Sequence, residues 1–437
     1  MSSSRHTEAA AWYSLFLLFV AYAIAWIDRQ ILTLLVPAIK ADLGLTDFQI
    51  SLLQGFAFSL LYAFAGIPVA KLADMQSRRR IIAIGMALWS LMTVACGWSK
   101  NFVQLFLARV GVGVGEAALS PAAYSLIADL FPVRKHATAY AVFQVGSTIG
   151  GGLAMILGGA LLAWLARVDL STLPLLGELS GWQAAFIIVG LPGLAFSLLM
   201  LTATEPARRT PPRDHAQGSV LSFLLANRRL YGTLFFAVGL LGLLSIGTAV
   251  WYPTFLIRLH GFTPAQAGYA YGIIILIAGT AGILCGGRLS DALISRGIGQ
   301  ANVRIMQWST GIKLLPLIIG PLLADPLWVL GMMAIATFIG HMSSGVAIAC
   351  LQAITPDQYR ARISAVMLLV VNLLAIGLGA TYVAALTDYV FADEMAIHYS
   401  LALAAATIGP LILLLLWWNQ HAIDRPLVWP TAAPAQS

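Results

Sequence analysis

Charged residues are scarce in this sequence of 437 residues: Lys, Arg, Asp and Glu make up 10% of it, and hydrophobic residues make up 59%. Soluble globular proteins carry about 25% charged residues, so a water-soluble globular fold is excluded. Cysteine is nearly absent as well, and Cys96, Cys285 and Cys350 all fall in apolar runs, which argues against a disulfide framework. The mean hydropathy of +0.86 indicates a polytopic membrane protein.

Motifs of catalysis are also missing. The sequence contains no H-E-x-x-H zinc motif, no Gly-rich phosphate loop and no paired nucleophile and base. A membrane-embedded enzyme acting on lipids is therefore disfavoured, and we expect neither a cofactor nor a metal. A receptor that does not transport is a further alternative, but a receptor would not need the repeated gate loop that this chain carries.

Twelve apolar runs are close to the length that crosses a bilayer, which is about 20 helical residues. The sequence therefore predicts an all-α membrane protein with twelve transmembrane helices in two six-helix bundles. The runs cover residues 11–37, 48–70, 81–99, 102–128, 137–164, 183–203, 231–257, 267–287, 305–323, 326–354, 363–387 and 398–420.

Basic residues are distributed unevenly over the loops between these runs. If both termini are cytoplasmic, 18 of the 25 Lys and Arg residues fall on that side and three fall within helices. The opposite side then holds four, namely Lys40, Lys100, Arg167 and Arg258. The positive-inside rule thus predicts cytoplasmic termini, and we expect a bacterial inner membrane protein. The net charge of +7 reflects this topology and anionic headgroups, so no nucleic-acid partner is expected.

The two halves of the chain repeat one loop motif. Asp74 is followed five residues later by Arg79, and Asp291 is followed by Arg296 in the same way, 217 residues further on. This spacing indicates a parallel duplication of six helices. The predicted domains are a first bundle over 1–204, a cytoplasmic linker over 205–230 and a second bundle over 231–437.

The repeated loops have the composition of a gate. An Asp at a helix end can attract the positive N-terminus of a neighbouring helix, and the arginines can pair with lipid or with another acid. We therefore expect a cytoplasmic gate formed by Asp74, Arg78, Arg79, Asp291 and Arg296. Anchoring by the positive-inside rule alone would not explain both Asp residues.

Ionisable side chains inside the apolar runs are the strongest functional signal. Asp28 and Arg29 lie in the first run, and Arg109 and Glu116 lie seven residues apart in run 102–128, so both point to one side of a helix. A charge at bilayer depth costs at least ~2.5–3.5 kcal/mol, so each needs a partner, a cavity or a substrate. We expect Asp28, Arg109 and Glu116 to form one buried cluster with Arg29 beside it. A purely structural lock between two helices is the alternative.

Other residues in the apolar runs are weaker evidence for function. Gly111, Gly113 and Gly115 remove side chains from more than one face of their helix, which predicts close approach of a neighbour. The second half has no Asp or Glu in its predicted helices, and the polar side chains that we single out there are Lys313, His341 and Asn372. Lys313 either snorkels or pairs with substrate.

Three stretches of this sequence resemble the major facilitator superfamily, and within it the Spinster-like branch of lipid transporters. They begin at Trp26 (WIDRQILTLL), Ala108 (ARVGVGVGEAALSPAAYSLIADLF) and Thr355 (TPDQYRARISAVM). The gate motif of the superfamily normally has Gly four residues before its Asp, and here Ala70 and Gly287 hold those positions. The resemblance implies a two-bundle fold that alternates access about a central cavity lined by helices one, four, seven and ten.

The resemblance also implies roles for particular residues. In Spinster-like proteins the acid on helix one and the Arg and Glu on helix four are implicated in function, which corresponds to Asp28, Arg109 and Glu116 here. Substrates of that branch are amphipathic lipids such as sphingosine-1-phosphate and lysophospholipids.

Together these observations predict a proton-coupled carrier of amphipathic lipids that acts as a monomer among membrane lipids. Asp28, Glu116 and Arg109 are the predicted proton-coupling residues. Arg29 and Arg109 can hold a phosphate or carboxylate group. The full set of expected substrate contacts is Arg29, Arg109, Trp251, Tyr252 and His341. A proton-coupled carrier of small organic anions such as sugar acids is the alternative, because an Asp-Arg pair on helix one also occurs in those carriers.

Overall fold

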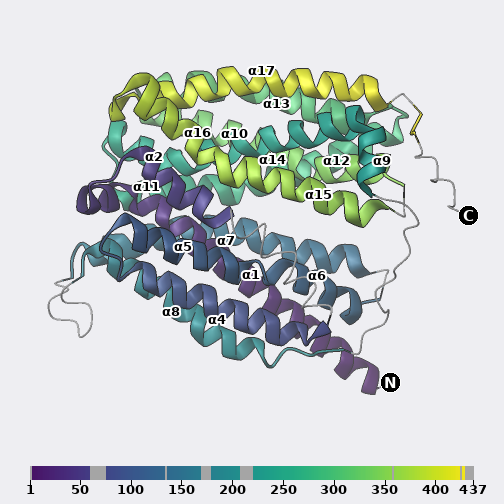
Figure 1. Cartoon of the computed structure of the whole chain (residues 1–437), viewed down its shortest axis with the longest axis horizontal. Helices are drawn as coiled ribbons and strands as arrows, with labels where there is room; N and C mark the ends of the chain where they lie inside the picture. The colour runs from purple at the N-terminus through teal and green to yellow at the C-terminus, as the bar shows by residue number, and fades with distance from the viewer. Residues whose placement is uncertain are drawn as a thin grey trace, which may run out of the picture. The chain divides into compact units, whose positions relative to one another are not determined.

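A computed structural model describes residues 2–59, 75–132, 135–168, 179–206, 220–356, 359–423 and 426–428. Within these ranges every regular element is helical and none is a strand (Figure 1), which confirms the all-α prediction. The gate residue Asp74 and residues 207–219 of the linker lie outside the described residues.

The described helices of the first half follow the apolar runs. They are α1 (Ser2–Leu43), α2 (Asp47–Ser51) with the π-helical turn η1 (Leu52–Phe56), α4 (Arg78–Cys96), α5 (Phe102–Glu116), α6 (Leu119–Leu130), α7 (His136–Leu165) and α8 (Gly181–Met200).

The second half is interrupted more often by π-helical and 3-10 turns. Its elements are α9 (Val220–Ala226), α10 (Arg228–His260), α11 (Pro264–Ile274), η4 (Ile275–Gly279), α12 (Thr280–Ser295), α13 (Ala301–Ile319), η5 (Gly320–Leu322), α14 (Pro326–Ile354), α15 (Arg360–Asn372), η7 (Leu373–Leu378), α16 (Gly379–Ala385), η8 (Leu386–Phe391), η9 (Glu394–Ala396) and α17 (Ile397–Ile423).

Ten of the twelve predicted spans correspond to helical stretches that are long and apolar enough to cross a membrane. The run over 48–70 is described only as far as residue 59. The run over 305–323 corresponds to α13, which is helical but is not among those ten stretches.

The structure corrects the predicted end of the first helix. α1 continues through Pro37 to Leu43, past the end predicted near that proline. It stops at Gly44, whose φ of +64° is a left-handed conformation that favours glycine. The N–H of Gly44 donates to the carbonyl of Lys40 at 2.9 Å, which satisfies one of the last carbonyls of the helix.

The run over 102–128 is two helices rather than one, with the break at Ala117 and Ala118 between α5 and α6. Pro121 explains the break, because it has no N–H to donate to the carbonyl of Ala117 and its ring clashes with that carbonyl. The N–H of Ala118 instead donates to Gly115 at 3.2 Å in a tighter turn. Glu116 is therefore the last residue of a helix.

The chain divides into two compact units. Unit 1 comprises Met1–Pro212, Ala249–Leu276 and Asp388–Met395, and unit 2 comprises Arg213–Thr248, Ile277–Thr387 and Ala396–Ser437. In unit 1, α1 packs on α7, and α4 packs on α5 and on α8, beside which it lies in Figure 1. In unit 2, α13 packs on α14 and on α17. The pairings α4–α8 and α13–α17 join the third with the sixth and the ninth with the twelfth predicted span, as a duplication would produce.

Glycines bring α5 close to two neighbours. A Cβ on Gly115 would lie 2.6 Å from the backbone nitrogen of Trp89 and 2.8 Å from the carbonyl oxygen of Gly85, both on α4. A Cβ on Gly113 would lie 2.5 Å from the carbonyl oxygen of Phe58. The predicted close approach is confirmed, and it positions the polar side chains of α5 against backbone.

Gly115→Ala is expected to destabilise the protein, because its methyl group would meet the α4 backbone, which cannot rotate aside as a side chain can. Overpacking typically costs about 1–3 kcal/mol, so the thermal unfolding midpoint in detergent should fall by several degrees. Gly151→Ala is the matched control, since the nearest heavy atom to its added Cβ is 3.9 Å away. Equal midpoints for the two variants would contradict the close contact between α4 and α5.

Candidate functional site

The buried charges of α1 and α5 meet inside unit 1. Arg29 pairs with Glu116, with both Nε and Nη2 of the guanidinium 2.5 Å from Oε2 of the carboxylate. The guanidinium carbon of Arg29 also lies 4.3 Å from the ring centroid of Phe58 and 5.4 Å from that of Trp26. Glu116 is 1% exposed, so this ion pair is largely withdrawn from water. Arg29, expected beside the cluster, is thus the partner of its glutamate.

Arg109 has a different role from the one that its spacing suggested. Its Nη1 donates to the backbone carbonyl of Asp28 at 3.3 Å, and its Nε donates to the carbonyl of Leu53 at 3.4 Å. Leu53 lies in the π-helical turn η1. Arg109 therefore joins α5 to α1 and η1 through backbone rather than through a carboxylate.

Asp28 is the unusual member of the cluster. Its side chain is 0% exposed, yet within the described ranges neither carboxylate oxygen accepts a hydrogen bond. The indole of Trp89 and the hydroxyl of Thr93 act on it as hydrogen-bond donors at the margin of hydrogen-bonding geometry, and neither group has another partner. Glu116 and Arg109 also act on it electrostatically. Burying an ionised carboxylate without an ion pair costs roughly several kcal/mol of folding free energy. A bound proton neutralises the group and removes that cost.

The gate arginines of the first half bind acids that the sequence reasoning did not single out. Arg78 is 1% exposed and pairs with Asp129 at the end of α6, and its Nε lies 2.9 Å from Oε1 of Glu205 beyond α8. The guanidinium of Arg79 donates to the carbonyl of Ala203 at 3.0 Å. Both arginines thus hold the ends of α4, α6 and α8 together.

Glu205 also caps α4. Its carboxylate accepts the backbone N–H groups of Arg78 and Arg79 at 3.2 and 3.0 Å, and the hydroxyl of Ser77 at 2.8 Å. Burial alone would raise the pKa of this carboxyl, but the N–H of Arg79, the guanidinium of Arg78 and the Ser77 hydroxyl together lower it. A negative group at a helix N-terminus stabilises that helix.

The second gate loop is arranged differently. Asp291 lies inside α12 and Arg296 directly follows that helix, so the expectation of second-half helices without acids is wrong. Both side chains are exposed, and within the described ranges neither takes part in an ion pair or a side-chain hydrogen bond. Their role in a gate stays a prediction.

The aromatic residues expected to contact substrate lie in the interior of unit 1. Trp251 and Tyr252 are buried, and the ring of Tyr252 meets that of Tyr271 edge-on with centroids 5.6 Å apart. His341, in unit 2, is half-buried and its Nδ1 lies 2.8 Å from the carbonyl of Thr337, one turn earlier in α14. Their part in substrate binding stays a prediction.

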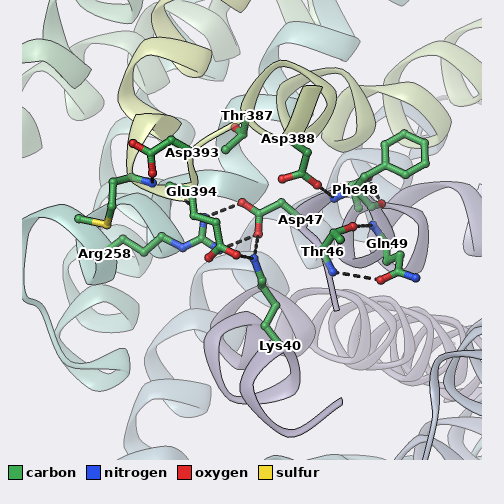
Figure 2. A network of polar contacts seen from close by, with 12 residues as sticks. Lys40, Thr46, Asp47, Phe48, Gln49, Arg258, Thr387, Asp388, Asp393 and Glu394 are labelled. Atoms are coloured by element: carbon green, nitrogen blue, oxygen red, sulfur yellow. Dashed lines mark hydrogen bonds and ion pairs between the residues drawn. The ribbon is translucent and has the colours of Figure 1, made fainter. Parts of the chain in front are cut away.

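A second charged network in unit 1 lies where α1 ends. Figure 2 shows the Asp47 carboxylate between Lys40 and Arg258, with Glu394 beside them. Arg258 grips Asp47 with two bonds of 2.6 Å, one to each oxygen, and Nζ of Lys40 lies 2.6 Å from Oδ1. Glu394 accepts from Lys40 at 2.7 Å but is 57% exposed. The network joins α1, α2, α10 and η9.

Local sequence explains why Asp47 is held in place. Thr46 caps α2: its hydroxyl accepts the N–H of Gln49 at 3.2 Å, and the amide oxygen of Gln49 accepts the N–H of Thr46 at 3.0 Å. This T-x-x-Q capping box was readable from sequence and would have located Asp47 in the first turn of a helix. Burial alone would raise the pKa of the Asp47 carboxyl, but Arg258 and then Lys40 hold it below its ordinary value of 3.8.

A pocket of about 740 Å³ opens beside this network. Charged residues of both signs line it together with backbone of the loop that follows α1: Pro37, Lys40, Ala41, Gly44, Leu45, Thr46, Arg258, Asp388, Tyr389, Ala392, Asp393 and Glu394. The N–H of Phe48 donates to Asp388 at 2.7 Å, which ties η8 to α2.

Comparison with known proteins identifies the family to which this chain is similar. A model described as the Major Facilitator Superfamily matches residues 18–380. A protein described as an MFS-type efflux pump of Mycolicibacterium smegmatis is 28% identical over 377 residues, which cover 84% of this chain and 82% of the pump. A probable L-galactonate transporter of Escherichia coli is 28% identical over 312 residues, which cover 67% of this chain and 64% of that transporter.

A solved structure agrees in fold. A bacterial homologue of the human lysosomal transporter Spinster, in an inward-facing and occupied conformation, superposes with a TM-score of 0.79 at 27% identity. The match covers 96% of this chain and 98% of that one. The resemblance read from the sequence motifs is therefore confirmed.

Asp47→Asn should destabilise the protein at neutral pH, because it leaves Arg258 and Lys40 without a full counter-charge. Breaking a buried pair by removing one partner costs about 3–5 kcal/mol, whereas exposed pairs contribute about 0–1 kcal/mol, so Glu394→Gln is the matched control. Since the folded pKa of Asp47 is lowered, its stabilisation is present above the ordinary carboxyl pKa and is lost as pH falls through the folded pKa.

Unfolding midpoints of wild type and Asp47→Asn, measured in detergent from about pH 7 down to about pH 3, should therefore converge on acidification. A pH-independent difference, or an equal loss in Glu394→Gln, would show that the Asp47 pairing is not the stabilising element.

Proposed function

Because the chain belongs to the major facilitator superfamily, we propose that it is a proton-coupled secondary transporter that moves amphipathic lipids by alternating access. Its family and its many spanning helices make it a multi-pass membrane transporter rather than an enzyme. Proton coupling and the lipid substrate are the proposal.

One observation carries the proton coupling: the carboxylate of Asp28 is fully buried with no ion pair among the described residues, one residue from the arginine that pairs with Glu116. If the cluster served only to hold two helices together, we would expect each of its charges to have an oppositely charged partner. Here one acid is paired and the other is not, so the cluster holds a place for a proton. Intramembrane ionisable groups of this kind mark proton relays in transporters.

The geometry suggests how protonation can change the site. A proton on Glu116 removes the charge that attracts Arg29, and the guanidinium then becomes available to another anion. Asp28 responds because it senses the charge of Glu116 and of Arg109. Arg109, fixed on two backbone carbonyls, supplies a constant positive charge. We assign Asp28 and Glu116 as proton carriers and Arg29 as the group that exchanges between Glu116 and the substrate.

The lipid substrate is what the resemblance of the sequence motifs to the Spinster-like branch implies, and the likeness to a bacterial homologue of the lysosomal transporter Spinster supports that branch. Arg29 suits a phosphate or carboxylate headgroup, because guanidinium groups bind such groups in bidentate fashion, and we assign Arg109 to the same headgroup through its positive charge. We further assign Trp251, Tyr252 and His341 to the walls that receive substrate.

The gate residues and topology complete the proposal. Arg78 and Arg79 hold the helix ends of the first half. We assign them to a cytoplasmic gate together with Asp74, Asp291 and Arg296. Both termini are assigned to the cytoplasm of a bacterium, the bundles to residues 1–204 and 231–437, and the carrier to a monomer.

A carrier of small sugar acids is the second candidate, and the probable L-galactonate transporter favours it. An Arg beside an Asp on the first helix can bind a sugar carboxylate as readily as a phosphate. The two candidates differ in the apolar part of the substrate rather than in its charge.

Glu116→Gln is expected to abolish the dependence of transport on a pH gradient in proteoliposomes, because glutamine cannot carry the proton. Stimulation by the gradient should fall from at least about tenfold to none, a barrier change of about 1.4 kcal/mol or more. Glu394→Gln is the control, since its exposed carboxylate lies outside the cluster. The unfolding midpoint of Glu116→Gln should show that the variant is folded, and an unchanged pH dependence would remove Glu116 from the coupling.

Competition will separate the two substrate classes. Uptake of a labelled lysophospholipid into proteoliposomes should be inhibited by other lysolipids and not by hexuronates or galactonate, because only the lipids supply an apolar chain to bury, at about 0.8 kcal/mol per methylene group. Strong inhibition by galactonate, together with saturable galactonate uptake, would instead establish the sugar-acid carrier.

A further inference from the structure

Unit 2 contains a buried cation that the proton-coupling cluster does not use. Lys313, on α13, is 2% exposed, and its Nζ lies 3.3 Å from the hydroxyl oxygen of Ser245 on α10. Within the described residues no carboxylate pairs with it. The snorkelling that the sequence left open is excluded, because a snorkelling lysine carries its ammonium to water.

The surroundings of Lys313 are polar but hold no acid among the contacts of the described residues. One turn earlier, the hydroxyl of Ser309 lies 2.5 Å from that of Ser343 on α14. His341 lies within electrostatic reach of Lys313, and its Nδ1 is committed to the carbonyl of Thr337. A Cβ on Gly340 would be 3.9 Å from Cδ of the lysine, so α14 presents a glycine beside the lysine stem. Hydroxyl groups satisfy dipoles but do not neutralise an ammonium ion.

Burying an ammonium group without a counter-ion is costly, and chains retain such groups where the charge is used. The hydroxyl that holds Lys313 belongs to Ser245, whose side chain is exposed. Of the two side chains, Ser245 is therefore the one that lies at the surface. A structural bond alone would need no charge, since an uncharged donor could hold Ser245 equally well.

We propose that Lys313 and Ser245 form an anion-binding site in the second half of the chain, which takes the carboxylate or phosphate group of a ligand. The ammonium supplies the charge and the serine hydroxyl donates a hydrogen bond to the same oxyanion. That the ligand is the transported substrate rests on the proposed function, whereas the site itself does not. The ligand is either the headgroup of an amphipathic lipid or a small free anion, which share this chemistry.

The test measures anion binding to the purified full-length protein in detergent by thermal stabilisation and by calorimetry. The three probes are inorganic phosphate, galactonate and an oleoyl lysophosphatidate. At least one should stabilise the wild type saturably. Lys313→Met should weaken its affinity at least tenfold and leave the unfolding midpoint without ligand unchanged or higher, because the variant removes an uncompensated buried charge. Lys100→Met, at an exposed lysine, should bind as the wild type does.

The arms of the experiment separate the sources of the anion. Lys313-dependent binding of the lysophosphatidate alone identifies a lipid headgroup, and Lys313-dependent binding of galactonate or phosphate identifies a small anion. If Lys313→Met does not remain monodisperse, Ser245→Ala carries the test, with an expected two- to fivefold loss of affinity. Affinities unaffected by both substitutions, or no binding of any probe to the wild type, would overturn the site.

Glu116→Gln in the same assay distinguishes this inference from the proposed function. The variant should keep the Lys313-dependent binding, because the partner of Glu116 among the described residues is Arg29, and that of Lys313 is Ser245. Loss of pH-driven transport with intact binding supports both statements. If transport still responds to a pH gradient but no probe binds in a Lys313-dependent way, only the anion site is contradicted.

Discussion

The cost of placing an ionised side chain away from water governs the functional regions of this protein. An ion pair repays that cost only when geometry and further hydrogen bonds are good. The chain meets the condition fully at Asp47, whose two oxygens are gripped by Arg258 and Lys40. It meets the condition partly in the cluster of α1 and α5, where Arg29 pairs with Glu116 while Asp28 has no hydrogen bond.

The degree to which each buried charge is paired distinguishes the structural charges from the charges that we assign to transport. Arg78, held by Asp129 and Glu205, joins three helix ends, and the network around Asp47 joins four segments of unit 1. In these networks each buried charge has an oppositely charged partner, so the helices that they join are held in one arrangement. Asp28 and Lys313 are buried as deeply, yet neither takes part in an ion pair among the described residues, and we propose a proton for the first and an anion for the second.

Much of this was predictable from sequence, and the failures have physical causes. Hydropathy located the spans because a bilayer imposes their length, and helical spacing put Arg109 and Glu116 on one side of a helix. Periodicity does not choose between Asp28 and its neighbour Arg29, whose side chains diverge by about 100°, so it could not show that Arg29 is the side chain that pairs with Glu116. Asp47 and Arg258 are 211 residues apart, and no local pattern links them. Pro121, by contrast, was a readable signal for the break after Glu116.

The central claim is that the α1–α5 cluster binds and releases a proton. Infrared difference spectroscopy of the purified protein over a pH titration tests it most directly, because a protonated carboxylic acid absorbs separately from a carboxylate. The account predicts a pH-dependent band of a buried protonated carboxyl that is altered in both Asp28→Asn and Glu116→Gln. A band that is unchanged in both variants, or no such band at any pH at which the protein is folded, would contradict it.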